Sequence, residues 1–143
     1  MDLNTYLGFD GNCAAAFKFY EKVLGGKILM MMAYGDMPGC SDMSADVKAK
    51  IAHARMQLGD KLLMGSDAPH GRYEKPAGFH VNIGVNDPAQ ADRLFAALSE
   101  SGTVTMPIQE TFWATRFGML VDQFGTPWMI NCEKAAAKSA TAA

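Results

Sequence analysis

Two helix patterns with the same residue types at their starts and ends constrain the fold of this chain more than any other feature of its sequence. An aspartate, Asp10, precedes the first pattern and Gly25 ends it, while Asp87 precedes the second and Gly102 ends it. Asp87 lies 77 residues after Asp10, and Gly102 lies 77 residues after Gly25. Equal offsets between identical start and stop residues predict two copies of one structural unit.

Each helix pattern has its own capping signals and one apolar face. Asn12 is the N-cap candidate of the first helix, and Asp87 followed by Pro88 starts the second. Glycine after each pattern is typical of a helix end. The apolar residues at helical spacing are Cys13, Phe17, Tyr20 and Leu24 in the first pattern and Ala91, Leu94, Phe95 and Leu98 in the second.

Strand patterns complete both copies in the order strand, helix, strand, strand, strand. The expected strands are 5–9, 27–34, 51–58, 61–64, 80–85, 103–106, 113–121 and 127–132. Gly59-Asp60 and 123–125 are the expected turns. We therefore predict an α+β fold in which a single domain, 1–132, contains two βαβββ modules of about 1–66 and 79–132. The alanine-rich end, 133–143, is expected to be a flexible tail.

Composition and charge exclude several classes of protein. With 143 residues, 49% of them hydrophobic and 20% charged, the chain has the size and balance of one globular domain. Its 13 Lys and Arg, spread along the chain beside 15 Asp and Glu, argue against a nucleic-acid partner. The longest apolar run, 28–34, is too short for a membrane span, and the N-terminus lacks the basic start of a signal peptide. We expect a cytoplasmic protein whose three cysteines are reduced.

Two segments lack strand or helix patterns. Residues 35–50 are rich in Gly, Pro, Ser and Asp, and they form either a mobile connection or a lid over a site. Residues 65–78, with two prolines and three glycines, are the natural joint between the two halves.

Several strings of residues resemble the PhnB-like family of the vicinal-oxygen-chelate superfamily, which includes glyoxalase I, bleomycin-resistance and extradiol-dioxygenase proteins. The resemblance runs from about Leu3 to Asn131. The strings that carry it are Phe9-x-Gly-Asn-Cys-x-x-Ala, Phe19-Tyr20 with Leu24-Gly25, Ile51-Ala-His-Ala54, Ser66-Asp-Ala68, Gln109-Glu-Thr-Phe-Trp-Ala114, Phe117-Gly118 and Asp122-x-Phe-Gly-x-Pro-Trp-Met-Ile-Asn131.

This resemblance implies paired βαβββ modules that form a curled mixed sheet around a cavity, and a homodimer. It agrees with the duplication inferred from the equally spaced start and stop residues of the two helices. Proteins of this kind sometimes carry a demethylubiquinone methyltransferase label. The chain has no G-x-G-x-x-G loop, which a methyltransferase with a nucleotide-like cofactor would need.

The resemblance also defines where a metal would bind. Metal enzymes of the superfamily hold one divalent cation with four inward side chains, from the first and last strands of both modules. On this sequence those positions fall on Thr5, His80, Met64 and Met129. Since thioethers are soft ligands, only His80 suits a hard or borderline cation. We expect no cofactor and no strongly bound metal. The alternative is a divalent-metal lyase or dioxygenase that uses His80 with His53 or Glu110.

One dense stretch, 110–122, offers a carboxylate, an indole and a guanidinium. Glu110 and Trp113 form either the polar end of an apolar pocket or ordinary surface and packing contacts. For Arg116 and Asp122 we favour an ion pair over a role in binding. The candidate substrate-binding residues are Glu110, Trp113, His53, His80 and Met129.

The remaining candidates have structural explanations or an undecided orientation. His53 alternates with Arg55 on one side of a strand, and the sequence leaves open which side faces the cavity. Asp67 is expected to cap a turn. Cys13, at a helix start, could have a lowered pKa, but it falls on the apolar face and is expected to be packed.

Methionine is the compositional excess, at 11 of 143 residues. Most of them fall on expected strands, among them Met30 to Met32, Met56, Met64, Met119 and Met129. We therefore expect a methionine- and aromatic-lined cavity that binds a small, partly apolar molecule, whether or not the protein is an enzyme. Drug-binding relatives suggest a further version of this hypothesis, in which the protein sequesters its ligand at the dimer interface.

Overall fold

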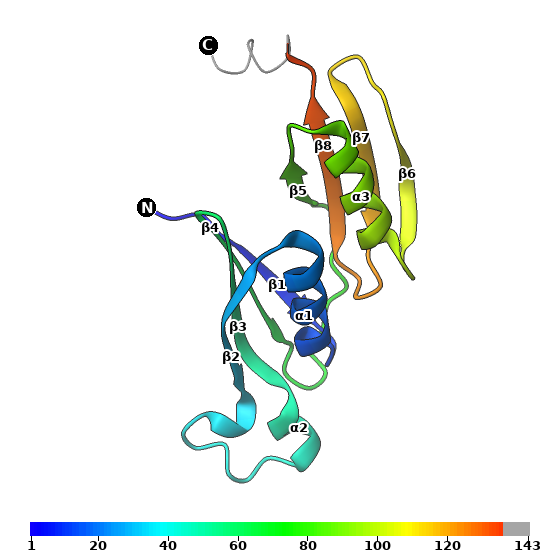
Figure 1. Cartoon of the computed structure of the whole chain (residues 1–143). Helices are drawn as coiled ribbons and strands as arrows, with labels where there is room; N and C mark the ends of the chain where they lie inside the picture. Colours follow the sequence, from blue (N-terminus) through cyan, green and yellow to red (C-terminus); the bar gives the residue numbers. More distant parts are fainter. Residues whose placement is uncertain (136–143) are drawn as a thin grey trace. The chain divides into compact units, whose positions relative to one another are not determined.

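Each half of the chain folds into a four-stranded mixed sheet with one long helix on it (Figure 1). The computed structural model describes residues 1–135. It divides into two units, Met1–Lys75 and Pro76–Ala143. The α+β class and the two modules with the order βαβββ are therefore confirmed. No helix in the described residues is long and apolar enough to cross a membrane.

The first unit has the strand order β1-β4-β3-β2. Strands β1 and β4 are parallel, and the other neighbours are antiparallel. The long helix α1 contacts β2, β3 and β4. The elements are β1 (Thr5–Phe9), α1 (Cys13–Leu24), β2 (Lys27–Ala33), the 3-10 turn η1 (Tyr34–Asp36), α2 (Ala45–Ala49), β3 (Ile51–Leu58) and β4 (Lys61–Asp67).

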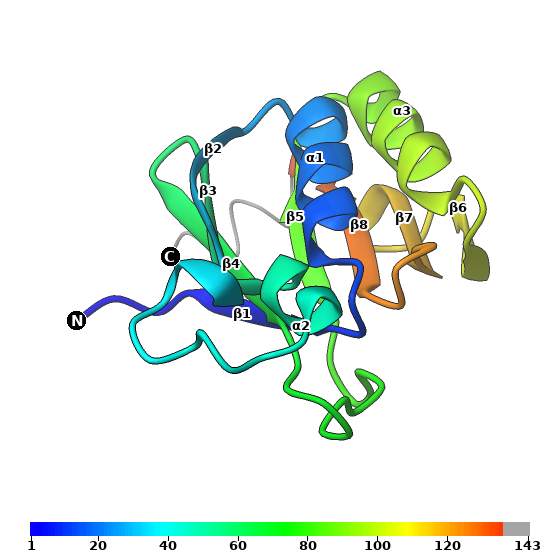
Figure 2. The ribbon, with the colours of Figure 1, turned by 90° about the horizontal axis from the view of Figure 1, so that it is seen from below.

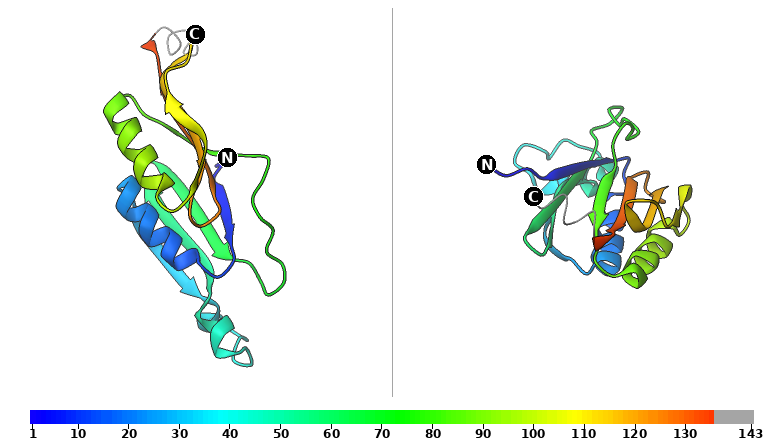
Figure 3. Two further views of the ribbon diagram at one scale, coloured as in Figure 1. Left: turned by 90° about the vertical axis from the view of Figure 1, so that its right-hand side faces the viewer. Right: turned by 90° about the horizontal axis from the view of Figure 1, so that it is seen from above.

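The second unit repeats this topology with the order β5-β8-β7-β6. Its two parallel strands are β5 and β8, the counterparts of β1 and β4. The helix α3 contacts β6, β7 and β8, and it lies along one face of these strands in Figure 3. The elements are β5 (Val81–Gly84), α3 (Pro88–Ser99), β6 (Thr103–Gln109), β7 (Ala114–Val121) and β8 (Pro127–Glu133).

A buried aspartate far along the chain caps α1, although Asn12 is its N-cap residue. The Asn12 side chain makes no capping bond. Instead the Asp67 carboxylate accepts the backbone N–H of Cys13 at 3.0 Å and that of Ile51 at 2.8 Å. Asp67 is 1% exposed, so these charge-assisted bonds tie the end of β4 to the starts of α1 and β3. Asp67, which was expected to cap a turn, thus makes long-range tertiary contacts.

The second helix begins as predicted but ends differently. The Asp87 side chain accepts the N–H of Ala89 at 3.0 Å, with Pro88 in the first turn. At the other end, Ser101 takes the left-handed conformation with φ 57°, whereas Gly102 does not. A Cβ on Gly102 would lie 2.4 Å from the Val121 carbonyl oxygen. Gly102 is therefore required for close approach to β7 and not for the helix cap that the sequence suggested.

An aromatic residue of each helix packs directly over a strand glycine. A Cβ on Gly65 would lie 2.8 Å from Cε2 of Phe17, and one on Gly118 would lie 2.6 Å from Cε2 of Phe95. Figure 2 shows α1 beside the strands of the first unit. The absence of a side chain at these glycines lets each helix approach its own sheet closely. On the opposite face of each sheet, which we call the outer face, residues 1–135 place no helix of the same unit.

Several element ends differ from the sequence expectation. Strand β4 continues three residues past Met64 to Asp67, and β6 continues three residues past Met106 to Gln109. Residues 65–67 pair with β1, and Gln109 pairs with Phe117 on β7, which periodicity does not report. Glu133 belongs to β8 and not to the tail. The part of the expected tail from 136 to 143 lies outside the described residues.

Residues 34–50, which include the segment 35–50 that was left open between a mobile connection and a lid, contain two short helical turns, η1 and α2. Ser44 caps α2 by accepting the N–H of Val47 at 3.4 Å. The Tyr34 hydroxyl donates to the Asp67 carbonyl at 2.9 Å, which anchors the start of the segment to the end of β4. In Figures 1 and 2 the segment extends from the ends of β2 and β3.

We predict that Gly118→Ala lowers the free energy of unfolding by about 1 to 3 kcal/mol, because the added methyl group overpacks the Phe95 contact. Gly84→Ala, on the outer face of β5 with no atom within 4 Å of its Cβ position, is the matched control. It should change stability by no more than about 0.5 kcal/mol. Urea denaturation of both variants measures the difference, and equal effects would contradict the packing described here.

Candidate functional site

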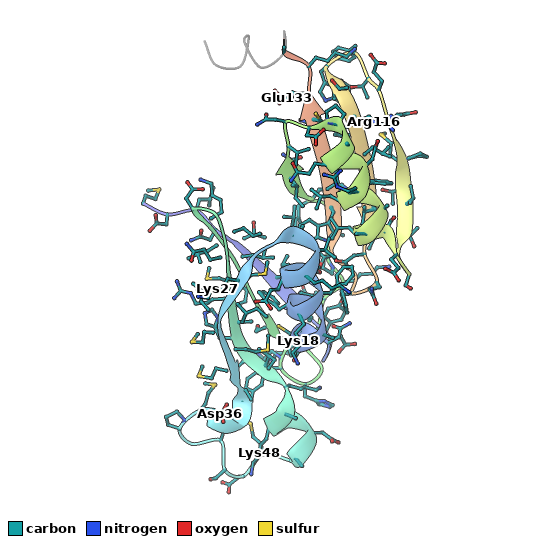
Figure 4. All side chains as sticks on the ribbon, viewed as in Figure 1. Lys18, Lys27, Asp36, Lys48, Arg116 and Glu133 are labelled. Atoms are coloured by element: carbon teal, nitrogen blue, oxygen red, sulfur yellow. The ribbon has the colours of Figure 1, made fainter. Side chains whose placement is uncertain are left out.

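The outer face of the first sheet carries a cross-strand row of long side chains. Met30 on β2 stands opposite Arg55 on β3, Arg55 stands opposite Met64 on β4, and Met64 stands opposite Tyr6 on β1. Paired residues project to the same side of a sheet. Tyr6 is 50% exposed and Met30 is 37% exposed. In Figure 4 sulfur atoms lie along β2 and β3 on the side away from α1.

Tyr6 and His53 form a polar pair on this same face. The Tyr6 hydroxyl lies 3.1 Å from Nδ1 of His53, and the two rings stack with centroids 5.7 Å apart at 18°. Since β4 lies between β1 and β3, the tyrosine side chain reaches across it. His53 stands opposite Met32 on β2. The face that holds His53 is therefore the outer one, which the sequence left open.

Arg55 is a cation at the centre of the outer face of the first sheet. In the described part of the chain it makes no ion pair, and its Nε is buried without a hydrogen-bond partner. The helix-facing residues next to it on β3, Ala54 and Met56, are fully buried. Arg55 is thus a hydrogen-bond donor that lies between Met30 and Met64 on the neighbouring strands.

The outer face of the second sheet carries the corresponding row. Asn82 on β5 stands opposite Met129, Met129 stands opposite Met119 on β7, and Met119 stands opposite Met106 on β6. All three methionines are half-buried. We call these three residues the methionine row. Of the candidate residues, Met129 is therefore placed at the centre of an outer face.

Aromatic side chains lie near the methionine row at the start of β7. The rings of Trp113 and Phe117 pack edge to face with centroids 5.1 Å apart, and Phe117 stands opposite Asn131. The Asn131 side chain donates to Glu133 at 3.4 Å, while its Oδ1 is buried without a partner. Trp113 is half-buried and packs on Phe117. This end of the face therefore combines an indole with a free acceptor.

Glu110 lies beside Trp113 in sequence but makes a surface ion pair. Its carboxylate is 2.8 Å from Nζ of Lys134, and its side chain is 68% exposed. The hydrogen bond from Lys134, and then its charge, lower the pKa of the Glu110 carboxyl. A carboxylate with a lowered pKa is a poor proton donor at neutral pH. Its contact with Lys134 therefore supports the surface interpretation of Glu110.

His80 lies outside the strand that was expected to hold it. Strand β5 begins at Val81, and His80 is exposed just before it. His53 belongs to the first unit, and the other candidates, Glu110, Trp113, His80 and Met129, belong to the second. The Trp113 ring packs on Phe117, and Phe117 lies on the outer face of the second sheet, two residues before Met119 of the methionine row.

The residues at the expected metal positions do not form a donor set for a hard cation. Thr5 pairs with Leu63, on the helix-facing side, so it does not share a face with Met64. The residues that do oppose Met64 and Met129 are Tyr6 and Asn82. A phenol, a carboxamide and two thioethers are poor ligands for Mn, Fe or Zn. In residues 1–135 no three His, Cys, Asp or Glu side chains are grouped to hold a metal.

The predicted ion pair between Arg116 and Asp122 is wrong. Nε of Arg116 donates to Asp92 on α3 at 2.8 Å, because Arg116 projects to the helix-facing side (Figure 4). That hydrogen bond raises the pKa of Arg116. Asp122 is 4% exposed and accepts the indole N–H of Trp128 at 2.8 Å. Asp122 lies just past the end of β7, six residues from Arg116, and its carboxylate also accepts the N–H groups of Phe124 and Thr126, so equal parity in the sequence did not bring the two side chains together.

Sequence reasoning missed Tyr6 and Arg55 as site residues. Both alternate with residues of the buried core, Leu7 on β1 and Ala54 on β3. That alternation placed Arg55 with His53 and was available from the sequence. What the sequence lacked was the register of β1 beside β4, which places Tyr6 within reach of His53.

The two sheets, each with a helix on one face and methionines on the other, define a protein of the paired βαβββ class. The chain belongs to the Glyoxalase/Bleomycin resistance protein/Dioxygenase superfamily, whose family model matches residues 3–130. This confirms the resemblance read from the sequence strings.

Individual relatives agree with this assignment. Protein YjdN from Escherichia coli K12 is 35% identical over 94% of this chain and 97% of that protein. The crystal structure of PA1353 from Pseudomonas aeruginosa is 44% identical, with a TM-score of 0.83 over 93% of this chain and 98% of that one. A Bacillus cereus PhnB protein, described as a putative 3-demethylubiquinone-9 3-methyltransferase, has a TM-score of 0.75 at 23% identity, covering 92% and 99% of the two chains. That likeness shows the fold alone.

Cys13 yields a prediction about pH. Burial, and then the charge of Asp67, raise the pKa of the Cys13 thiol from 9.0 to about 12. The folded protein keeps a proton that the unfolded chain releases, so this contribution to stability is complete below pH 9 and is lost towards pH 12. We expect the free energy of unfolding, measured in urea, to fall more between pH 8 and 10.5 in the wild type than in Cys13→Ala. Parallel pH profiles would contradict it.

Proposed function

We propose that this chain binds a small, partly apolar molecule against the methionine-lined outer faces of its sheets. The observation that carries this proposal is the methionine row Met106, Met119 and Met129, with Asn82 at its end. Thioether side chains are polarisable and flexible, so they adapt to the shape of an apolar ligand. A row of half-buried methionines on a sheet face without a helix is the kind of surface that ligand sites use.

Polar groups next to the methionine row would orient such a ligand. The buried Oδ1 of Asn131 lacks a donor, and a buried acceptor without a partner is costly unless a ligand supplies one. The Trp113 ring offers a flat apolar surface at the same end. We assign Trp113 and Met129 to the ligand contacts of this face and His53 to those of the first sheet.

The Cys13 thiol, at the start of α1, is not an activated nucleophile that would favour turnover over binding. The pKa of Cys13 is raised by burial, which keeps the thiol protonated and inert at neutral pH. Binding or sequestration of the ligand is therefore the function that these residues support best.

The test uses the neutral fluorescent probe N-phenyl-1-naphthylamine. We predict that the folded protein binds it, and that Met119→Gln or Met129→Gln weakens binding by about three- to tenfold, because a similar volume becomes polar. Met37→Gln, at an exposed methionine of the 34–50 segment, is the matched control and should retain wild-type affinity. Circular dichroism confirms that each variant is folded. Failure to bind the probe, or equal affinities in all variants, would count against the proposal.

We also propose that the protein is a cytoplasmic homodimer. Edge strands β2 and β6 carry exposed apolar side chains, Leu29 at 49% and Val104 at 45%. An exposed edge with apolar residues favours burial against another chain. Sedimentation equilibrium should give twice the 15.4 kDa mass of one chain. A single species of 15.4 kDa at micromolar concentration would contradict this prediction.

A further inference from the structure

We propose that the outer face of the first sheet contains a carboxylate-binding subsite, in which Arg55 binds the anionic end of the ligand. This inference rests on the proposed function and names the chemistry that the ligand carries. His53, which pairs with Tyr6, lies two residues from Arg55 on β3, and Met30 and Met64 stand opposite Arg55 on the neighbouring strands. The ligand is accordingly a small organic acid with an apolar body.

Arg55 occupies the middle of its face. It stands between Met30 and Met64 in the cross-strand row, so thioether carbons flank its side chain on two strands. None of the side chains that project outward from these strands is acidic. They are Tyr6 on β1, Lys27, Met30 and Met32 on β2, His53, Arg55 and Gln57 on β3, and Leu62, Met64 and Ser66 on β4. The face therefore leaves a guanidinium without a counter-ion.

The surroundings of the Arg55 guanidinium favour the binding of an anion. Its Nε is buried and lacks an acceptor. A buried donor without a partner costs free energy, and this cost is greater for a charged group. Nε and one terminal nitrogen of arginine together form a fork that matches the two oxygens of a carboxylate. A bound carboxylate would satisfy this donor where the protein does not.

The neighbouring His53 and Tyr6 extend the polar area. His53 is two residues from Arg55 on the same strand, so the two side chains share the outer face. The Tyr6 hydroxyl is held 3.1 Å from Nδ1 of His53, which fixes the orientation of both rings. The pair can donate or accept hydrogen bonds beside the anion, since both groups carry such atoms.

The charge of the face selects a singly charged group. Arg55 is the central cation, and the next cation on the face is Lys27, which pairs with Gln57 at the end of the sheet (Figure 4). A doubly charged phosphate or phosphonate would favour a cluster of cations at one point. One guanidinium in an apolar row is suited to a carboxylate, and the methionines are suited to the rest of the molecule.

The experiment compares each acid with its own neutral amide. Isothermal titration at pH 7.5 would use ω-phenyl carboxylates with two to five methylene groups and the matching primary amides. We expect at least one acid to bind about tenfold more tightly than its amide. Arg55→Gln should remove this preference while leaving the amide affinity within twofold. Arg55→Lys should restore part of the preference, because the charge returns without the fork.

Controls separate the possible failures. Arg72→Gln, at an exposed arginine outside both sheets, should retain the preference for the acid. Equal binding of acids and amides would overturn the carboxylate subsite and leave the proposed function standing. Failure of both series to bind would instead count against the proposed function itself. Competition by methylphosphonate that exceeds competition by acetate would replace the carboxylate with a dianion and overturn this assignment.

Discussion

The contact between a helix aromatic and a strand glycine is the interaction on which the rest of each unit depends. Phe17 packs over Gly65 and Phe95 packs over Gly118, at distances that leave no room for a Cβ. Because these contacts commit α1 and α3 to one face of their sheets, the opposite faces carry no helix from the described residues of the same unit. The methionines and polar groups of the proposed site lie on those opposite faces.

Two buried carboxylates support this arrangement in different ways. Asp67 accepts backbone N–H groups from Cys13 and Ile51, which are 54 and 16 residues away in the chain. Asp122 instead organises its own turn, accepting the N–H groups of Phe124 and Thr126. Their hydrogen bonds satisfy the carboxylates that burial would otherwise penalise. Both carboxylates therefore serve to hold the fold together.

The two outer faces share a geometry but differ in chemistry. The row of the second sheet ends in a carboxamide, Asn82, and borders the unpaired Oδ1 of Asn131, whereas the row of the first contains Arg55 and ends in Tyr6. Duplication has thus kept the sheet while the polar groups have diverged. One face offers an acceptor and the other offers a cationic donor, so the two faces suit different chemical groups.

The sequence by itself determined the duplication, the element order and most strand bounds, because helix caps and alternation are local signals. It also located the methionine excess on strands. Only the tertiary structure decided which side of β3 faces outward, since both sets of alternating residues contain apolar members. The register of β1 beside β4 and the reach of Asp67 also depend on contacts distant in sequence. For that reason the fold was predictable, whereas the grouping of Tyr6, His53 and Arg55 was not.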